Sequence, residues 1–419
     1  MDLELRPVAE EEAAAFTRAT YVAFGGVPSE ESLARAVDRF DADFALAVLD
    51  HGRMVATTSA YRLEMTLPAP AGQTMPRVAC AGVTAVGVIP THRRQGLLRR
   101  LMDRQLQDLR ERGFGVAALL ASEATIYGRF GYGRAQLSQA LAIERRHAAF
   151  TPEAEALAAS GRVRIIEPDE AAKVLPSLHD GVRGVTPAEM NRSATWWTWH
   201  LKDLERERGG GGARMYAVHE SDTGEADGWV SYRVHDSWPL GGVPRWKAVV
   251  TDLVAAADAT RAALWRLVLN IDLVEEVTAP LVPVDDAVTW LLADSRRARV
   301  TEVADHLWLR ILDVPKALAA RGYGSDERLT IEVTSPDASA AGRFVLETAP
   351  TGAACRPARA GEKAQLRLTL ADLGAIYLGG VAPSVLARAG RVHELQAGAL
   401  AAADRVFASP RAPFCSLHF

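Results

Sequence analysis

The sequence predicts an α/β protein that ends in an α+β region, and three observations support this fold class. Up to about residue 147, strand and helix signals alternate in the order β-α-α-β-β-β-α-β-α-β. From about residue 150 this pattern partly repeats. From about residue 303 strand signals precede helix signals, which is typical of α+β domains. A chain of 419 residues is more than one hydrophobic core usually holds, so two or three domains are expected.

The composition argues against several classes of protein. Hydrophobic residues make up 48% of the chain and charged residues 24%, which is ordinary for a globular protein, and the formal net charge is -4. No basic, aromatic-interleaved segment predicts a nucleic-acid partner, and no apolar run is long enough for membrane insertion. The three cysteines are an odd number without metal-ligand spacing, and the N-terminus lacks an apolar signal-peptide core. We therefore expect a cytoplasmic protein with no metal, no nucleic-acid partner and no membrane insertion.

Element signals in the first region follow one another closely. Leu3–Val8 suggests a strand, and an Ala/Glu-rich helix follows to about Phe24, where two glycines break it. Ser29 is an N-cap residue for a second helix. Phe44–Leu49 and Met54–Thr66 are strand signals that flank a turn-forming tetrapeptide, so they predict a β-hairpin.

The next strand, turn and helix carry the strongest functional signal. Val83–Ile89 is apolar, β-branched and followed by proline, so it predicts a buried strand. Apolar residues recur at helical spacing from Leu97, and Gly113 ends that helix. The basic turn Thr91–Gly96 lies between them. Free backbone N–H groups and the helix dipole favour phosphate at a helix N-terminus, and Gly96 lets the backbone approach closely, so this turn predicts an anion site.

A second strand and turn follow at a short distance. Residues 115–122 are apolar and predict another buried strand. Glu123 then begins a short helix, and a Tyr-Gly-Arg-Phe-Gly-Tyr-Gly run starts at Tyr127. Two motifs in this order and at this distance are far more specific than either motif alone.

Residues 150–302 partly repeat this organisation. Short strand and helix signals lead to a long Trp-bearing helix, predicted for Ala188–Arg208, and then to further strands that end with Lys247–Val254. The next turn, Ala255–Ala259, has neither the arginines nor the glycine of the first turn, and its Asp258 would repel phosphate. We interpret this region as a degenerate second copy that binds no cofactor.

The last region, from about residue 303, differs from the first two in the order of its strand and helix signals. Strand signals precede helix signals, namely strands at 307–312, 329–333, 342–347 and 364–370 and helices at 371–378, 383–389 and 397–408. The final segment, Pro413–Phe419, is apolar and aromatic. A solvated tail would not need that composition, so we expect the end of the chain to be packed.

The basic turn resembles motif A of the GNAT (Gcn5-related) acetyltransferases, written Arg/Gln-x-x-Gly-x-Gly/Ala. Arg93 and Gly96 fit this motif, whereas Leu98 departs from it at the last position. GNAT proteins carry a similar Tyr-x-x-x-Gly-Phe/Tyr run after their fifth strand, which here begins at Tyr127. The sequence pattern Ser-Glu-x-x-Ile-Tyr-Gly-Arg-Phe-Gly-Tyr-Gly resembles the one found in the Eis (enhanced intracellular survival) family of GNAT N-acetyltransferases. The resemblance covers essentially the whole chain, including its last residue, Phe419.

The resemblance implies tandem GNAT-like domains, the second degenerate, followed by a sterol-carrier-protein-like α+β domain. The expected ranges are 1–150 for the acetyl-CoA-binding domain, 151–302 for the degenerate copy and 303–419 for the last domain, with a catalytic C-terminus. A homohexamer is also implied. Acetyl-CoA is the implied co-substrate, and its expected contacts are Val86, Gly87, Val88, Arg93, Arg94, Gln95, Gly96, Leu97, Leu98, Arg99, Ser122 and Glu123.

Acetyl transfer to an amine needs a proton donor for the departing thiolate and a base for the amine. A phenol with a pKa of about 10 is protonated at neutral pH, so Tyr127 is the candidate general acid, and we assign Tyr132 to core packing. The base is less clear from the residues, because His92 lies where it would donate to anions and Glu123 is expected beside the cofactor. The resemblance names the free α-carboxylate of Phe419, whose pKa would rise on burial.

The acceptor stays open at this point. The candidate substrate contacts are Trp196, Trp197 and His418, and core packing competes with cation–π binding of an amine for the tryptophans. We expect a small amine-bearing acceptor, aminoglycoside-like or another polyamine. Gly25 and His418 nevertheless supply no carboxylate where aminoglycoside-acetylating relatives have an acidic pocket. Acetylation of protein lysines is one alternative, and a lipid-binding protein with an inactive GNAT scaffold is another.

Overall fold

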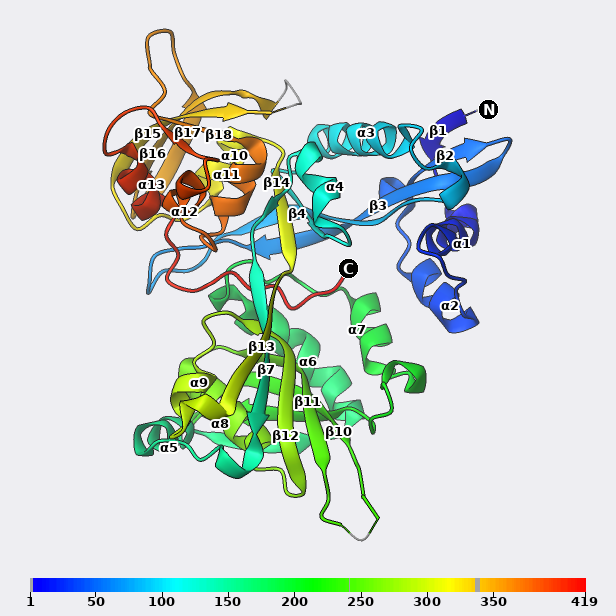
Figure 1. Ribbon diagram of the computed structural model, residues 1–419, viewed down its shortest axis with the longest axis vertical. Helices are drawn as coiled ribbons and strands as arrows, with labels where there is room; N and C mark the ends of the chain where they lie inside the picture. Colours follow the sequence, from blue (N-terminus) through cyan, green and yellow to red (C-terminus); the bar gives the residue numbers. More distant parts are fainter. Residues whose placement is uncertain (1–2, 241, 336–339) are drawn as a thin grey trace. The chain divides into compact units, whose positions relative to one another are not determined.

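The computed structural model describes residues 3–240, 242–335 and 340–419, which form two compact units. Unit 1 contains the chain up to Gln136, residues 306–410 and the last two residues, and unit 2 contains residues 137–305 and 411–417. Each unit has its own seven-stranded sheet, and a five-stranded sheet is formed by the later part of unit 1 (Figure 1). The expected α/β fold with a C-terminal α+β region is confirmed.

The first sheet of unit 1 has the strand order β1-β2-β3-β4-β5-β14-β6. Its strands are β1 (Leu3–Pro7), β2 (Leu46–Asp50), β3 (Arg53–Thr66), β4 (Arg77–Val88), β5 (Val116–Leu120), β14 (Leu307–Ile311) and β6 (Gly133–Arg134). β4 and β5 are parallel, as a strand–helix–strand connection requires. β2 and β3 form the predicted hairpin.

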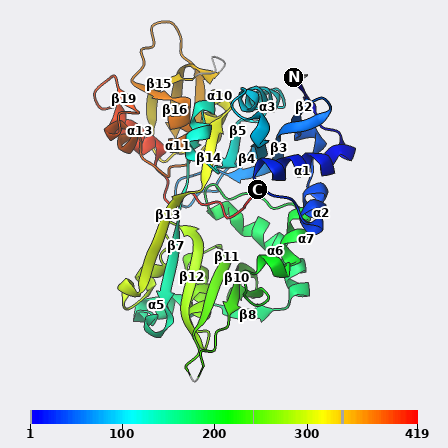
Figure 2. The same cartoon turned by 45° about the vertical axis from the view of Figure 1, so that its right-hand side comes forward.

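Strand β14 completes this sheet although it lies far along the chain. It lies beside β5 on one side (Figure 2) and pairs with β6 on the other. Leu309 is therefore opposite both Ala118 and Gly133. Its alternate residues are fully buried, which agrees with a strand in the interior of a sheet. The apolar pattern at 307–312 predicts the strand, but it cannot predict the neighbours.

The helices around this sheet begin and end where local signals indicate. They are α1 (Ala13–Ala23), α2 (Glu30–Asp38), α3 (Leu97–Glu111) and α4 (Ala124–Tyr127). The side chain of Ser29 accepts a hydrogen bond from the backbone N–H of Ser32, which is the N-cap expected for α2. Helix α3 buries Leu101, Met102 and Leu106, so its apolar stripe forms part of the core of unit 1.

Unit 2 has the strand order β13-β7-β12-β11-β10-β9-β8. Its strands are β13 (Ala298–Asp305), β7 (Leu137–Glu144), β12 (Val274–Pro283), β11 (Trp246–Ala255), β10 (Ala226–His235), β9 (Met215–Glu220) and β8 (Arg162–Ile166). Its helices are α5 (Pro152–Ala158), α6 (Pro168–Val182), α7 (Ala194–Leu201), α8 (Asp258–Leu269) and α9 (Val288–Leu291). β7 precedes this region in the chain and pairs with both β12 and β13.

The prediction of one long Trp-bearing helix over Ala188–Arg208 is wrong. The helix in that range, α7, begins after Ser193, whose side chain caps the N–H of Trp196. It ends within two residues of Asp203, whose φ of +50° is incompatible with a continuing right-handed helix.

The segment 411–417 is packed within unit 2, as expected for the end of the chain. Phe414, Cys415 and Leu417 are buried, and the N–H of Phe414 donates to the carbonyl of Pro187. The hydroxyl of Ser416 donates to Glu189 at 2.7 Å.

The later part of unit 1 forms the five-stranded sheet β17-β16-β15-β18-β19. The elements are α10 (Val314–Ala320), β15 (Glu327–Thr334), β16 (Gly342–Ala349), β17 (Gly352–Pro357), β18 (Leu366–Thr369), α11 (Leu370–Tyr377), α12 (Pro383–Arg388), β19 (His393–Glu394) and α13 (Ala399–Phe407). Helix α11 lies against β6 and β14, since a Cβ on Gly133 would be 1.8 Å from the carbonyl oxygen of Ala371. Glycine is therefore required at that crossing.

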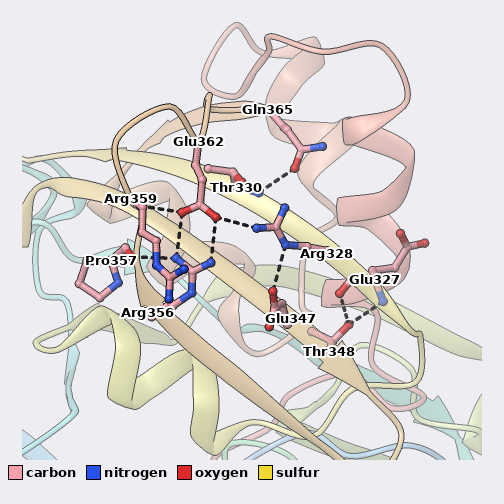
Figure 3. Close-up of polar contacts among 10 residues, drawn as sticks. All are labelled: Glu327, Arg328, Thr330, Glu347, Thr348, Arg356, Pro357, Arg359, Glu362 and Gln365. Carbon is pink, nitrogen blue, oxygen red and sulfur yellow. Dashed lines mark hydrogen bonds and ion pairs between the residues drawn. The ribbon is translucent and has the colours of Figure 1, made fainter.

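Charged side chains in this later part of unit 1 have either charged side chains or backbone carbonyls as hydrogen-bond partners. Glu362 accepts two bonds from Arg356, one from Arg328 and one from the backbone of Arg359 (Figure 3), and these contacts hold the pKa of Glu362 well below its usual range. Arg321 is instead buried and donates to backbone carbonyls at the C-terminal ends of α11 and α13, where the helix dipoles favour a cation.

Among the helices within the described ranges, none combines the length and the apolar composition needed to cross a membrane. The three cysteines are free thiols.

Candidate functional site

A cavity of about 800 Å³ lies in unit 1, where the end of β4, the first turn of α3 and α4 meet. All the residues expected to contact the cofactor line this cavity except Gln95, whose amide is 3.5 Å from the carbonyl oxygen of Thr91. Tyr127 lines it as well. The end of α1, α4 and the turn after α4 contribute residues that sequence reasoning missed, namely Ala23, Phe24, Gly25, Ile126, Arg129 and Phe130.

The cavity opens because β4 and β5 separate. Their parallel pairing ends at Gly82 and Ala118, and β4 then has a bulge where its register with β3 shifts. Ala85 lies in this bulge with a φ of +54°, which is strained for a residue with a Cβ. Beyond the bulge, Val86–Val88 is half-buried, so its backbone groups lie at an open edge of the sheet.

The basic turn after β4 is shaped by two left-handed residues. Arg94 has a φ of +63° and Gly96 a φ of +79°, and Gly96 is the N-cap of α3. The first backbone N–H groups of α3 have no partner within the helix and, together with the helix dipole, favour an anion there. The side chains of Arg94 and Arg99 are exposed and line the cavity.

Two side chains of this turn have partners outside the turn. Arg93 donates from Nε to the carbonyl of Val88 at 3.2 Å and from Nη2 to the carbonyl of Ala23 at 2.7 Å. His92 is 3.2 Å from a carboxylate oxygen of Asp50 through Nε2. The negative charge of Asp50 beside this ring repels an anion, so His92 is a weaker candidate for binding an anion than its position in the sequence suggests.

Tyr127 ends α4 and is buried, at 5% exposure. Desolvation raises the pKa of its phenol and the charge of Glu123 adds to this, whereas a hydrogen bond with Ser122 acts in the opposite direction. The phenol is therefore protonated at neutral pH. The ring of Tyr132 meets that of Tyr127 edge to face at 6.1 Å and is fully buried in the core, which agrees with its assignment to packing.

The last residue lies in unit 1, against the middle of β4. A Cβ built on Gly82 would be 3.1 Å from two carbon atoms of the Phe419 ring and 2.5 Å from Leu63 Cδ1. Gly82 has an ordinary strand conformation, so what requires glycine here is the close approach of these side chains. Desolvation of the imidazole, and secondarily the guanidinium of Arg39, lower the pKa of His418.

Trp196 and Trp197 lie in unit 2 and contact a cation of the chain itself. The guanidinium of Arg192 is 4.6 Å from the ring centre of Trp196, 5.2 Å from that of Trp197 and 5.6 Å from that of Trp229. Trp197 and Trp229 belong to a buried core cluster, and Trp196 packs against it. The core-packing interpretation describes the surroundings of Trp197, and the cation at the rings of both tryptophans is an arginine of the chain.

The turn after β11 in unit 2 has no positive φ angle, and Asp258 is the first residue of α8. The carboxylate of Asp258 pairs with Arg411 at 2.8 Å. Within the described ranges, no group of three or more His, Cys, Asp or Glu residues is arranged to hold a metal ion.

Comparisons with known families agree with this architecture. Residues 4–135 and residues 188–311 each match a family described as an acetyltransferase (GNAT) domain. Residues 314–416 match a family described as a sterol carrier protein domain. The chain therefore contains tandem GNAT domains followed by a sterol-carrier-like domain.

Relatives extend over nearly the whole chain. A protein of Streptomyces avermitilis named as an N-acetyltransferase is 36% identical over 416 residues, which covers 99% of this chain and 98% of the relative. N-acetyltransferase Eis of Mycobacterium tuberculosis is 34% identical over 352 residues, covering 84% of this chain and 82% of the relative. The crystal structure of Eis1 from Mycobacterium abscessus superimposes with a TM-score of 0.84 at 31% identity and covers all of both chains. The chain belongs to the Eis family of GNAT N-acetyltransferases.

Proposed function

We propose that this N-acetyltransferase moves the acetyl group of acetyl-CoA to the amine of a small molecule by direct attack within a ternary complex. Support comes from the cavity at the open end of β4, which joins an anion-favouring helix N-terminus, an exposed strand edge and a buried phenol. The cofactor's phosphates would meet the turn at Arg94–Leu98, together with Arg99. Backbone groups of Val86–Val88 that face the cavity would bind its pantetheine arm and thioester.

In the proposed reaction, the amine nitrogen bonds to the thioester carbonyl carbon and the carbon–sulfur bond breaks. Tyr127 supplies the proton that the departing thiolate takes up. Its raised pKa keeps the phenol protonated at neutral pH, and its position in the cavity wall supports contact with the sulfur. The amine proton goes to the base, so the step leaves Tyr127 deprotonated and the base protonated. Proton exchange with water restores both groups before the next cycle.

The base in this proposal is the α-carboxylate of Phe419. The observation that carries this assignment is the contact between its ring and Gly82, on the same strand that lines the cavity at Val86–Val88. An α-carboxylate has an ordinary pKa of about 3.3–3.7, and burial among apolar groups would raise that pKa toward a value better matched to an amine.

The acceptor is proposed as a small amine-bearing molecule, with polyamines and aminoglycosides as the first compounds to test. His418 precedes the proposed base and is its nearest neighbour in the chain, so it is the first candidate for acceptor contact. Trp196 and Trp197 are kept as weaker candidates, since Arg192 already occupies their ring faces. Action in the cytoplasm as a homohexamer remains part of the proposal.

The test of the general acid is Tyr127→Phe, with Tyr132→Phe as the matched control. Removing the phenol of Tyr127 should lower kcat by roughly 10²–10⁴-fold, while acetyl-CoA affinity measured by calorimetry stays close to that of the wild type. The Tyr132 hydroxyl has no hydrogen-bond partner among the described residues, so its removal should leave kcat nearly unchanged. Equal turnover by the wild type and Tyr127→Phe would contradict the assignment.

The test of the base changes the end of the chain. One residue appended after Phe419 converts its carboxylate to a neutral amide, whereas deletion of Phe419 moves the terminal carboxylate to His418 and removes the aromatic ring. Both variants should lose most acetyl transfer and keep the melting temperature and acetyl-CoA affinity, whereas an N-terminal tag should have no effect. If a wild-type screen of amines with a free-thiol readout detects no transfer, and lipid copurifies, the binding-protein alternative is favoured instead.

A further inference from the structure

Helix α1 contacts the open end of β4 through two sets of hydrogen bonds that the reaction scheme does not use. The first set starts at the bulge. The hydroxyl of Thr57 on β3 donates to the carbonyl of Ala85 at 2.9 Å, and the hydroxyl of Thr20 on α1 is 3.0 Å from that of Thr57. The hydroxyl of Thr20 also lies 3.0 Å from the carbonyl oxygen of Phe16 on its own helix. Each hydroxyl has one proton, so Thr57 donates to the bulge and accepts from Thr20 only when Thr20 turns its proton away from Phe16. This links α1 to the most strained residue of β4.

The second set starts at the basic turn. Arg93 donates to the carbonyl of Val88, at the end of β4, and to the carbonyl of Ala23, at the end of α1. The carbonyl of Ala23 is among those at the helix C-terminus that lack a helical partner, so a cation is favoured there. The same guanidinium thus binds the helix and the strand together.

The backbone contact between these two sets is close. A Cβ on Gly87 would be 2.7 Å from the Cβ of Ala23, so α1 lies directly on β4 at this point. Thr57 and Arg93 therefore fix the strand at Ala85 and at Val88, on either side of Gly87. The segment between these two points is the one that faces the cavity through Val86 and Gly87.

We propose that Thr57 and Arg93 are positioning residues that clamp β4 to α1 and so fix the backbone that binds the acyl-pantetheine arm. Arg93 then serves the strand, and Arg94 is the cation of the turn that meets the cofactor's phosphates. This assignment departs from the one that the turn's sequence suggests, in which both arginines cradle phosphate. The proposal rests on the proposed binding of acetyl-CoA in this cavity.

The experiment compares two ligands that differ in their phosphates. Acetyl-CoA carries them, and S-acetylpantetheine keeps the acyl-pantetheine arm without them. Arg93→Gln should lower the affinity for both ligands by a similar factor of about five- to tenfold, which is the effect of losing one or two hydrogen bonds. Arg94→Gln should weaken the binding of acetyl-CoA and leave the binding of S-acetylpantetheine unchanged, because only acetyl-CoA has phosphates that Arg94 could contact.

The Thr57 arm uses the neighbouring threonine as its control. Thr57→Val should weaken both ligands as Arg93→Gln does, and Thr57→Ser, which restores the hydroxyl, should recover wild-type affinity. Thr58 is buried, and no partner for its hydroxyl is found in the described parts of the chain, so Thr58→Val should change neither affinity. Melting temperatures identify any variant whose fold is lost.

The outcomes separate this proposal from the proposed function. If the wild type binds neither ligand, the proposed function fails and the clamp has nothing to position. If the wild type binds both and Arg93→Gln weakens acetyl-CoA alone, Arg93 is a phosphate ligand and the clamp assignment is overturned. Wild-type affinities for both ligands in Thr57→Val would overturn the role of Thr57 in the same way.

Discussion

The two GNAT domains each contain a strand, a turn and a helix in the same order, but the two turns differ in charge and backbone shape. In the first, Arg94 and Gly96 adopt left-handed conformations and leave the N-terminus of α3 facing a cavity. In the second, the corresponding residues keep ordinary φ angles and Asp258 opens α8, paired with Arg411. A carboxylate at a helix N-terminus satisfies the same dipole that would otherwise attract a phosphate.

A bulge is common to the central strands of both domains. In β4 it falls at Ala85, and in β11 the register with β10 shifts next to Thr251, whose hydroxyl is 2.7 Å from that of Ser231. The strand after the bulge has different surroundings in each. Val86 lines the cavity, whereas Val254 is buried in a cluster with Trp197 and other aromatic residues. The comparison indicates that the backbone architecture is shared and that side chains decide whether the strand edge stays open.

The largest expected effect comes from making the first turn resemble the second. Arg94→Ala combined with Gly96→Asp removes a cation, adds an anion and forces a Cβ into a left-handed conformation. Loss of charge-assisted hydrogen bonds costs about 1.5–3 kcal/mol and the strain about 1–2 kcal/mol, so acetyl-CoA affinity should fall by about 100-fold or more. Calorimetric titration measures this.

The matched change in the second domain is Asp258→Asn, which removes the charge that opens α8. We expect it to leave acetyl-CoA affinity unchanged, because this turn is predicted to bind no cofactor. If Asp258→Asn instead changes the affinity or adds a second binding event in the titration, the second domain is not empty and the contrast between the turns does not hold.

A second contrast concerns two buried glycines. At Gly82 a Cβ would meet the flexible side chain of Leu63 and the ring of Phe419, so Gly82→Ala should shift the ring by a few tenths of an ångström. Since small misplacements of reacting groups are costly, kcat should fall by about tenfold, with little change in melting temperature or acetyl-CoA affinity. Steady-state kinetics beside calorimetry tests this.

Gly228 on β10 is the corresponding control in the second domain. A Cβ there would be 2.9 Å from the carbonyl oxygen of Val254 and 3.1 Å from the Cα of Ala255, and backbone atoms cannot move aside easily. Gly228→Ala should therefore lower the free energy of unfolding by about 1–3 kcal/mol and leave the kinetic constants of the remaining folded protein unchanged. A loss of kcat in Gly228→Ala comparable with that of Gly82→Ala would show that the kinetic effect is not specific to the ring of Phe419.

The sequence predicts the local parts of this site and misses the parts that depend on distant contacts. The turn at Thr91–Gly96, the helix after it and the strand before Tyr127 follow from periodicity, glycine and charge, which act over a few residues. The link from Thr57 to Ala85 spans 28 positions and depends on the register of two strands. Alanine carries no signal for a left-handed conformation, so the bulge has no local mark in the sequence.

The same distinction explains the other differences. The strand Leu307–Ile311 is predicted by its apolar pattern, but its place between β5 and β6 is fixed by pairing with residues more than 170 positions away, such as Leu309 with Gly133. The prediction of a helix over Ala188–Arg208 runs too far at both ends, and the residues after α7, Lys202–Arg208, contain no glycine or proline to mark its end. Ser193 was the local signal for its start, as an N-cap residue three positions before Trp196.

A smaller contrast concerns backbone strain at the two bulges. Ala85 has a φ of +54°, and no residue of Trp246–Ala255 has a positive φ. Ala85→Gly relieves strain of about 1–2 kcal/mol and adds about 0.5–1 kcal/mol of backbone entropy to the unfolded chain, so the free energy of unfolding should rise by up to about 1.5 kcal/mol. Thr251→Gly relieves no strain and loses the contact with Ser231, so it should be destabilising. Denaturant titrations compare the pair, and stability changes of the same sign would contradict the difference in strain.

The smallest expected effect is a dependence of stability on pH, and it arises from corresponding ion pairs at the first strand of each domain. Arg6 on β1 binds Glu12 with two hydrogen bonds of 2.7 and 2.8 Å, and the pKa of Glu12 falls to about 2, chiefly through these bonds. Arg164 on β8 likewise bonds to Glu220 and lowers the pKa of that carboxyl. A carboxylate whose pKa is lower in the folded state stabilises the fold above its ordinary pKa of about 4.5, and this contribution is lost as the pH falls toward 2.

Glu12→Gln should therefore lower the melting temperature slightly at pH 7. The difference in melting temperature between this variant and the wild type should shrink between pH 4.5 and pH 2. Glu220→Gln should show a difference of the same sign that shrinks as the pH falls below 4.5, and both effects should be small because both pairs are partly exposed. A difference between wild type and variant that stays constant over this pH range would mean that the carboxylate charge does not contribute to stability.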